Sequence, residues 1–223
     1  MPLLIRLILD FKKPFFSVII TSYNRAHLLK RALDSLLCQT EPDWEAIIID
    51  DGSTDNTAFE ICPYRNQKIQ YFWQQSKGAS ESKNAGINLA NGKFVTFLDS
   101  DDEYHPTHLQ TRKEILSKEK IDFLHGGVTV IGNKWVPDRL NYHQMISLSE
   151  CTIGGTFFIR KSIAIKLKGF RDLPLGSDAD LLERAKQKKV VIEKTDLPTY
   201  IYHRENSNSI TNKLALALHE ITV

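Results

Sequence analysis

The first hundred residues alternate strand patterns with helix patterns, and this alternation constrains the fold more than any other feature of the sequence. Four apolar runs have the length of buried strands, at residues 15–20, 44–50, 69–74 and 93–99. Helical patterns lie between them, at residues 26–38, 53–61 and 80–90. Such an order predicts a mostly parallel sheet flanked by helices, so we expect an α/β fold.

The pattern is less regular after Asp102. Helices are expected at residues 106–120, 161–169, 178–188 and 212–221. Short strands are expected at residues 123–131, 155–160, 190–194 and 199–203. The second half is therefore predicted to be a smaller mixed α+β region laid against the first.

Composition excludes several classes of protein. A chain of 223 residues is long enough for one domain with a sizeable core. The net charge of +2 and the even spread of Lys and Arg argue against a nucleic-acid binder. Three cysteines without a C-x-x-C pair predict neither a disulfide framework nor a zinc site, and indicate a reduced, cytoplasmic protein.

The N-terminal segment 1–14 is apolar but too short for a membrane span, which needs about 20 residues. Arg6 interrupts the apolar run, and no signal-peptide cleavage pattern follows it. Two interpretations stay open. The segment is an extension packed on the domain, or it makes a peripheral contact with the inner face of the membrane, with Lys12 and Lys13 facing anionic lipid.

Polar residues follow three of the predicted strands where each strand ends. The segments are 21–25 (TSYNR), 50–55 (DDGSTD) and 99–102 (DSDD). Ligands of open α/β sheets bind at the carboxyl ends of the strands, and parallel strands bring these three segments to one edge. Taken singly, each segment is also what a solvated turn or a helix cap would look like. Their joint placement favours a binding site.

The acidic residues of this edge indicate a cation. Clustered carboxylates raise one another's pKa unless a positive charge compensates them. Mg²⁺ or Mn²⁺ bound by one or two carboxylates completes its shell with phosphate and water, so a phosphorylated ligand such as a nucleoside diphosphate is expected. The sequence contains no P-loop, no G-x-G-x-x-G and no G-x-S-x-G motif.

Four segments, in this order and spacing, resemble the inverting family 2 glycosyltransferases of the GT-A fold: SVIITSYNR, IIIDDGSTDNT, SKNAGINLANGKFVTFLDSDD and GSDADLLERA. The resemblance covers about residues 15–210. It implies a Rossmann-like, mostly parallel sheet flanked by helices, with a mixed acceptor-side region. Residues 15–102 would bind the nucleotide-sugar and residues 103–210 the acceptor. Residues 1–14 would form an extension and residues 211–223 a C-terminal helix.

The resemblance also implies a reaction and its residues. A sugar would pass from a nucleotide-diphospho-sugar, most often a UDP-sugar, to a hydroxyl of a glycan or lipid-linked saccharide, in cell-surface polysaccharide or other glycoconjugate synthesis. The nucleotide-sugar would contact Thr21, Tyr23, Arg25, Asp51, Lys83 and Asp99, with Asp51 accepting from the uracil N–H. Asp101 and His203 would hold Mn²⁺ or Mg²⁺, and Asp178 would be the catalytic base.

The sequence departs from the family at one position near that base. Ser177 replaces the usual Glu before Asp178, which puts charge tuning and acceptor preference in doubt. Ser177 also reads as the helix cap, with Asp180 completing a capping box and pairing with Arg184. The alternatives are a nucleotidyltransferase and an inactive nucleotide-sugar-binding relative. The donor sugar, the acceptor, the linkage and the oligomeric state, a homodimer included, stay open.

Overall fold

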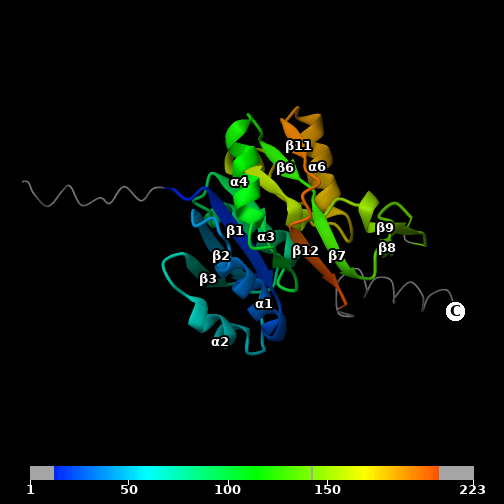
Figure 1. The fold of residues 1–223 in the computed structure, drawn as a ribbon. Coiled ribbons are helices and arrows are strands. Elements are labelled where there is room, and N and C mark those ends of the chain that lie inside the picture. The colour runs from blue at the N-terminus through cyan, green and yellow to red at the C-terminus, as the bar shows by residue number, and fades with distance from the viewer. Residues whose placement is uncertain (1–12, 142, 206–223) are drawn as a thin grey trace, which may run out of the picture.

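The computed structural model describes residues 13–141 and 143–205, which form a helix-flanked sheet of seven strands (Figure 1). The strand order is β11-β6-β10-β4-β1-β2-β3. The strands are β1 (Phe16–Ser22), β2 (Trp44–Asp50), β3 (Ile69–Trp73), β4 (Phe94–Phe97), β6 (Phe123–His125), β10 (Phe158–Arg160) and β11 (Ile192–Lys194). Strands β1 to β4 are mutually parallel, as the sequence predicts, whereas β10 is antiparallel to both of its neighbours.

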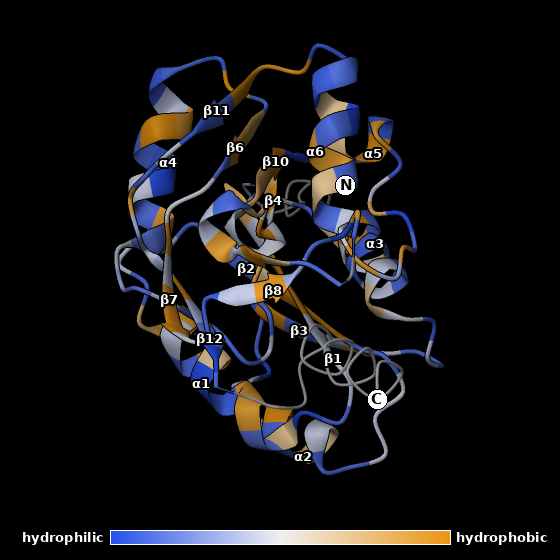
Figure 2. Cartoon of the chain, turned by 90° about the vertical axis from the view of Figure 1, so that its right-hand side faces the viewer, coloured by the Kyte–Doolittle hydropathy of each residue, from blue (hydrophilic) through white to orange (hydrophobic). Residues whose placement is uncertain are grey.

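The helices cover both faces of this sheet because alternate strand residues point to opposite sides. The α-helices are α1 (Ala26–Leu37), α2 (Thr57–Ile61), α3 (Ala79–Leu89), α4 (His108–Lys118), α5 (Lys161–Lys166) and α6 (Ser177–Gln187). Val18 of β1 packs in one hydrophobic cluster with Leu29 of α1. The next residue, Ile19, packs in the second cluster with Ile87 of α3 and Leu181 of α6. In Figure 2, α4 and α6 flank the strands β6, β10 and β4.

One predicted strand is wrong in its extent. The run 123–131 is not continuous, because β6 ends at His125 and β7 (Val128–Gly132) belongs to another sheet. Gly126 and Gly127 separate the two strands with φ angles of +93° and +78°, a conformation that glycine adopts without strain. A Cβ atom at Gly127 would lie 2.0 Å from the carbonyl oxygen of Leu197, so this turn also requires a very close approach of two backbones.

Two small sheets complete the second half. The first has the order β5-β12-β7 and contains β5 (Glu103–Tyr104) and β12 (Tyr200–Arg204). The second is a hairpin of β8 (Trp135–Pro137) and β9 (Met145–Ser147), which the sequence pattern did not predict. Three short 3₁₀ turns are η1 (Cys62–Tyr64), η2 (Leu148–Glu150) and η3 (Gly154–Thr156). The mixed character predicted for this half is confirmed.

Some expectations fall outside the described residues. Most of the segment 1–14 and the expected helix within 211–223 belong to them. Across the described ranges, no helix is long and apolar enough to cross a membrane. The cysteines, Cys38, Cys62 and Cys151, are all free thiols. The division into a nucleotide half and an acceptor half stays a prediction.

The N-terminus of α6 differs from the capping box expected there. The cap is Gly176, with a left-handed backbone and no side-chain cap, so Ser177 is already the first helical residue. The carboxylate of Asp180 instead binds Arg184 at 2.7 Å and Arg171 at 3.2 Å. Arg184 donates further to the carbonyl oxygens of Leu167 and Gly169. The expected Asp180–Arg184 pair is confirmed, and it ties α6 to the end of α5.

Asp180→Asn is expected to lower the free energy of unfolding, because the largely covered side chain of Arg184 loses its charged partner. Hydrogen bonds to charged groups contribute about 1.5–3 kcal/mol, and 1 kcal/mol lowers Tm by about 2–4 °C in a domain of this size. Glu183→Gln on the same helix is the matched control, since its ion pair with Arg139 is more exposed and should contribute less. Equal loss of Tm in the two variants, measured by calorimetry, would contradict the assignment.

Candidate active site

The carboxyl ends of β1, β2 and β4 lie side by side, as the sequence predicts. Ser22 is opposite Asp50 in the parallel register, and the Asp51 amide donates to the Ser22 carbonyl at 2.8 Å. On the other side of β1, the Leu98 amide donates to the Ile19 carbonyl at 3.0 Å. The segments 21–25, 50–55 and 99–102 therefore share one edge of the sheet.

Side chains join the loops that follow β1 and β2. Asn24, with a φ of 52°, accepts hydrogen bonds at Oδ1 from the amides of Thr54 (2.8 Å) and Asp55 (3.3 Å). Its own amide donates to Ser53 Oγ at 2.9 Å. Tyr23, predicted to contact the nucleotide, follows β1 with 53% of its surface exposed. The edge thus offers an aromatic surface on a fixed backbone.

Asp51 is buried, and residues of the turn at 74–78 donate hydrogen bonds to its carboxylate. Gln74 and Ser76 donate side-chain hydrogen bonds at 2.8 and 3.0 Å, and the amides of Lys77 and Gly78 donate at 2.9 Å each. Burial alone would raise the pKa of Asp51, but these hydrogen bonds outweigh it and hold the pKa below the usual range. The four donors make Asp51 an anchor of this turn, a role that the sequence did not reveal.

Asp101 is held by two arginines of the first half. Arg25 NH1 lies 3.1 Å from its Oδ2, and Arg31 donates to its carbonyl oxygen. Burial raises the pKa of Asp101, the adjacent Asp99 raises it further, and Arg25 opposes both. A cation that approaches this edge would therefore stabilise the ionised form of Asp101.

Asp102 has no exposed surface and fixes the second half to the acidic loop. Its Oδ2 accepts from the Tyr200 hydroxyl at 2.6 Å, and its Oδ1 accepts from the His203 amide at 2.8 Å. Burial, and then Asp99 and Asp101, raise the pKa of Asp102 well above its usual value. Both oxygens are engaged within the protein, so Asp102 is a structural residue of this loop.

Lys83 of α3 brings the two halves of the site together. Its Nζ lies 3.6 Å from Asp99 Oδ1 and 4.0 Å from Asp178 Oδ1. The same atom lies 5.2 Å from the centre of the Phe170 ring. Burial would lower the pKa of Lys83, but the two carboxylates raise it above its ordinary value. Lys83 is therefore an ammonium ion between a carboxylate of each half.

Asp178, the predicted base, lies at the start of α6 with 26% of its side chain exposed. Its Oδ2 accepts from the Gly154 amide at 2.9 Å, whereas its buried Oδ1 has no hydrogen-bond partner among the described residues. Burial raises the pKa of Asp178, Lys83 lowers it and Asp99 raises it. One oxygen is thus oriented by the backbone while the other remains available to a ligand.

Two adjacent glycines permit this approach and were missed at the level of sequence. A Cβ atom at Gly154 would lie 2.4 Å from Asp178 Oδ1, and one at Gly155 would lie 2.2 Å from the Tyr200 hydroxyl. Any larger residue would displace the base or the tyrosine that binds Asp102. The only signal in the sequence was the Gly-Gly pair in IGGTFF.

His203 lies beside the acidic loop on β12. Its Nε2 contacts Glu103 Oε1 at 2.9 Å, and its Nδ1 is buried without a hydrogen bond. Within the described ranges, no group of three His, Cys, Asp or Glu side chains is arranged to hold a metal ion. The clustered carboxylates of Asp99 and Asp101 still fit a cation that needs only one or two protein ligands.

Comparison with known proteins agrees with this architecture. The family model "Glycosyl transferase family 2" matches residues 17–175. The relative WfgD of Escherichia coli, a UDP-Glc:alpha-D-GlcNAc-diphosphoundecaprenol beta-1,3-glucosyltransferase, is 32% identical over 145 residues, which are 62% of this chain and 56% of WfgD.

Solved structures show the same fold. TarS 1–349 of S. aureus, in complex with UDP-GlcNAc, superposes with a TM-score of 0.75 at 23% identity, covering 87% of this chain and 60% of that one. The mannosyltransferase PcManGT of Pyrobaculum calidifontis, in complex with GDP-Man and Mn²⁺, gives 0.66 at 16% identity, covering 86% and 57%. The chain thus spans little more than half the length of WfgD and of these two solved chains. Because the family model matches well over half of its residues, the chain belongs to family 2 of the glycosyl transferases.

Proposed function

We propose that the protein transfers a sugar from a nucleotide-diphospho-sugar, with a UDP-sugar favoured, to an acceptor hydroxyl, with inversion and with a divalent cation. The observation that carries the proposal is Oδ1 of Asp178, which is buried, accepts no hydrogen bond from the described residues and lies 4.0 Å from Lys83, which in turn pairs with Asp99 after β4. A buried carboxylate oxygen that accepts no hydrogen bond is costly unless a ligand donates to it.

The nucleotide would bind over the loops after β1 and β2, against Thr21, Tyr23 and Arg25. Asp51 would accept from the uracil N–H, for which one of its four internal hydrogen bonds must give way. Gln74 and Ser76 can give way without moving the backbone, because their bonds come from side chains, whereas Lys77 and Gly78 donate from backbone amides. WfgD, a UDP-Glc-dependent glucosyltransferase, and TarS, solved in complex with UDP-GlcNAc, support this choice of donor.

Asp101, with Asp99 beside it, would hold Mn²⁺ or Mg²⁺, and His203 would approach it through Nδ1, which makes no hydrogen bond and lies 3.7 Å from Glu205 Oε2. When bound, the cation would neutralise charge that grows on the diphosphate leaving group. The PcManGT complex, which contains GDP-Man and Mn²⁺, supports a cation in a protein of this fold. Lys83 would lie next to the donor and would add a second positive charge to this side of the site.

The chemistry needs a base and no enzyme nucleophile. Asp178 Oδ1 would take the proton of the acceptor hydroxyl as its oxygen attacks the anomeric carbon, and the bond from that carbon to the diphosphate would break. One displacement inverts the configuration at that carbon. The Gly154 amide orients the base, and Lys83 keeps it ionised in its buried position. A glycan or lipid-linked saccharide of cell-surface polysaccharide synthesis would supply the hydroxyl.

Release of UDP from a panel of UDP-sugars, with mass detection of the products, tests the proposal. Wild-type protein should turn over at least one donor. Asp178→Asn should keep its affinity for UDP while losing about 10²-fold or more in transfer, because general-base catalysis contributes a factor of that order. An inactive relative would bind UDP without turnover of any donor, and transfer that survives in Asp178→Asn would show that Asp178 is not the base.

The acid side of the pH–rate profile should reflect the raised pKa of Asp178. A base that is protonated cannot act, so transfer should fall as pH decreases, with a midpoint above about 3.9, the ordinary value for Asp. Lys83 lowers this pKa. Lys83→Met should therefore move the midpoint to higher pH, which a profile of kcat measures. An unchanged midpoint would disprove the coupling between Lys83 and Asp178.

Asp101→Ala should abolish most of the Mn²⁺-dependent increase in UDP affinity, measured by calorimetry. A loss of at least about tenfold is expected, because removing even an indirect partner of a metal costs about 10–100-fold in affinity. Asp172→Ala, at an exposed acid, is the matched control. If Mn²⁺, and its removal by EDTA, change the UDP affinity of Asp101→Ala and of wild type equally, the cation is held elsewhere.

A further inference from the structure

A pocket opens at the edge of the sheet that carries the candidate active site, between strands of the second half and α6. Its volume is about 350 Å³. It is lined by the ends of β6 and β11, the segment 148–153 and two residues of α6, Leu182 and Lys186. Because β10 is antiparallel to both β4 and β6, strands β4 and β6 run in the same direction. The carboxyl end of β6 therefore lies at the edge that carries Asp99 and Asp101.

The pocket begins next to the proposed base. Ile153, which lines it, immediately precedes Gly154, whose amide binds Asp178. Asp178, Leu182 and Lys186 occupy successive turns of α6, so about 12 Å of helix separate the first from the last. A ligand that extends along this face can present a hydroxyl to Asp178 and another group to Lys186.

One end of the pocket is positively charged. Lys186 and Lys194 border His125 there, and no ion pair within 4.0 Å connects either lysine to a carboxylate of residues 13–141 or 143–205. Burial lowers the pKa of His125 to about 4, and the ammonium groups of Lys194 and Lys186 add to the shift. Asp196 also lines the pocket, but it does not offset these two charges at the imidazole.

The other end has the opposite character. Burial raises the pKa of the Cys151 thiol, and the carboxylates of Glu150 and Asp138 raise it further. An anion is therefore repelled from the segment 148–151 and attracted to the end formed by β6, β11 and Lys186.

We propose that this pocket is the acceptor subsite, and that Lys186 and Lys194 bind an anionic substituent of the acceptor, a phosphate or a carboxylate, while a hydroxyl of the same molecule reaches Asp178. The neutral His125 imidazole donates a hydrogen bond to that anion. The inference rests on the proposed function for the identity of the ligand as an acceptor. Binding of an anion at His125 is independent of it.

Histidine NMR of the full chain tests the subsite without any transfer reaction. Protein labelled at histidine is titrated with inorganic pyrophosphate, with glucuronate and with glucose as the neutral reference, and the His125 signal is identified by its loss in His125→Gln. A bound anion favours the protonated imidazole, so the His125 pKa should rise from about 4. A response to pyrophosphate identifies a phosphate subsite, and a response to glucuronate alone identifies a carboxylate subsite.

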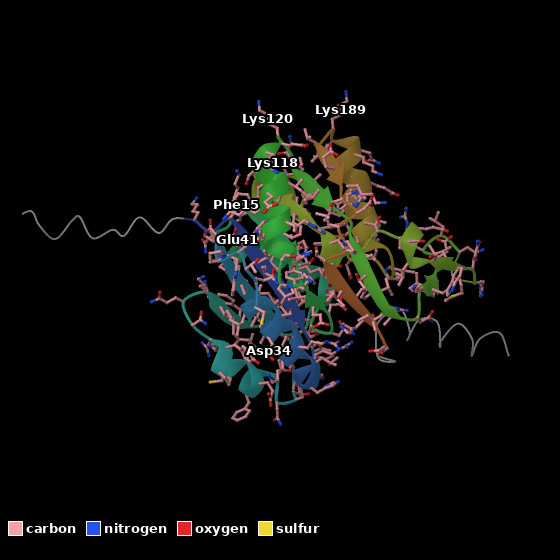
Figure 3. All side chains as sticks on the ribbon, in the orientation of Figure 1. Phe15, Asp34, Glu41, Lys118, Lys120 and Lys189 are labelled. Atoms are coloured by element: carbon pink, nitrogen blue, oxygen red, sulfur yellow. The ribbon has the colours of Figure 1, made fainter. Side chains whose placement is uncertain are left out.

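The double variant Lys186→Gln, Lys194→Gln should weaken binding of the responding anion by about tenfold or more, as expected for lost charge-assisted hydrogen bonds. The matched control is Lys188→Gln, Lys189→Gln, which removes the same charge from exposed positions outside the pocket; Lys189 points away from the body of the molecule in Figure 3. Its binding should equal that of wild type.

Two results would overturn the inference. One is a His125 signal that neither anion perturbs more than glucose does. The other is equal loss of binding in the two double variants, which would reduce the effect to net charge. Failure of the UDP-release panel with an intact response at His125 would leave the anion subsite in place and refute the transferase proposal alone.

Discussion

The ammonium group of Lys83 makes the arrangement of acids in this protein possible. It lies within 4.0 Å of Asp99, from the first half of the chain, and of Asp178, from the second. Two carboxylates brought together in a poorly solvated place repel each other and take up protons. The positive charge between the two carboxylates offsets their repulsion. Both halves can therefore contribute an acid to one site.

The position of that charge depends on how closely α3 lies on the sheet. Gly86 faces Ile19 of β1, where a Cβ atom would come within 2.4 Å of the isoleucine side chain. On its other side, α3 is fixed by Asn84, which accepts from the Phe170 amide at 2.8 Å and donates to its carbonyl oxygen at 2.9 Å. The helix therefore cannot move away from either half without losing packing or paired backbone groups.

The sequence predicted the features that local pattern controls. Apolar runs ending in Asp50 and Asp99 indicated parallel strands that end at one edge of a sheet, and the structure places β2 and β4 in that way on either side of β1. The features it could not predict come from contacts between distant segments. The partners of Asp102 are 98 and 101 residues away, and the Gly154 amide meets Asp178 across 24 residues. The prediction that Ser177 caps the helix was wrong for a different reason. The cap position is Gly176, which has a left-handed backbone and no side chain that could accept a hydrogen bond.

The reversed direction of β10 has a consequence for how such a chain can diversify. Phe158, at the start of β10, pairs with Thr96 near the end of β4. Strand β10 therefore begins at the ligand edge, where β1, β2 and β4 end, and the segment before β10 lies at that edge. That segment includes the β8–β9 hairpin and residues 148–153, which line the pocket beside α6. None of its residues belongs to the loops after β1, β2 or β4. Residues 133–153 can therefore change between relatives without altering the loops that follow β1, β2 and β4. Under the proposed function, variation in this stretch would alter contacts to the acceptor while the loops that face the donor stay the same.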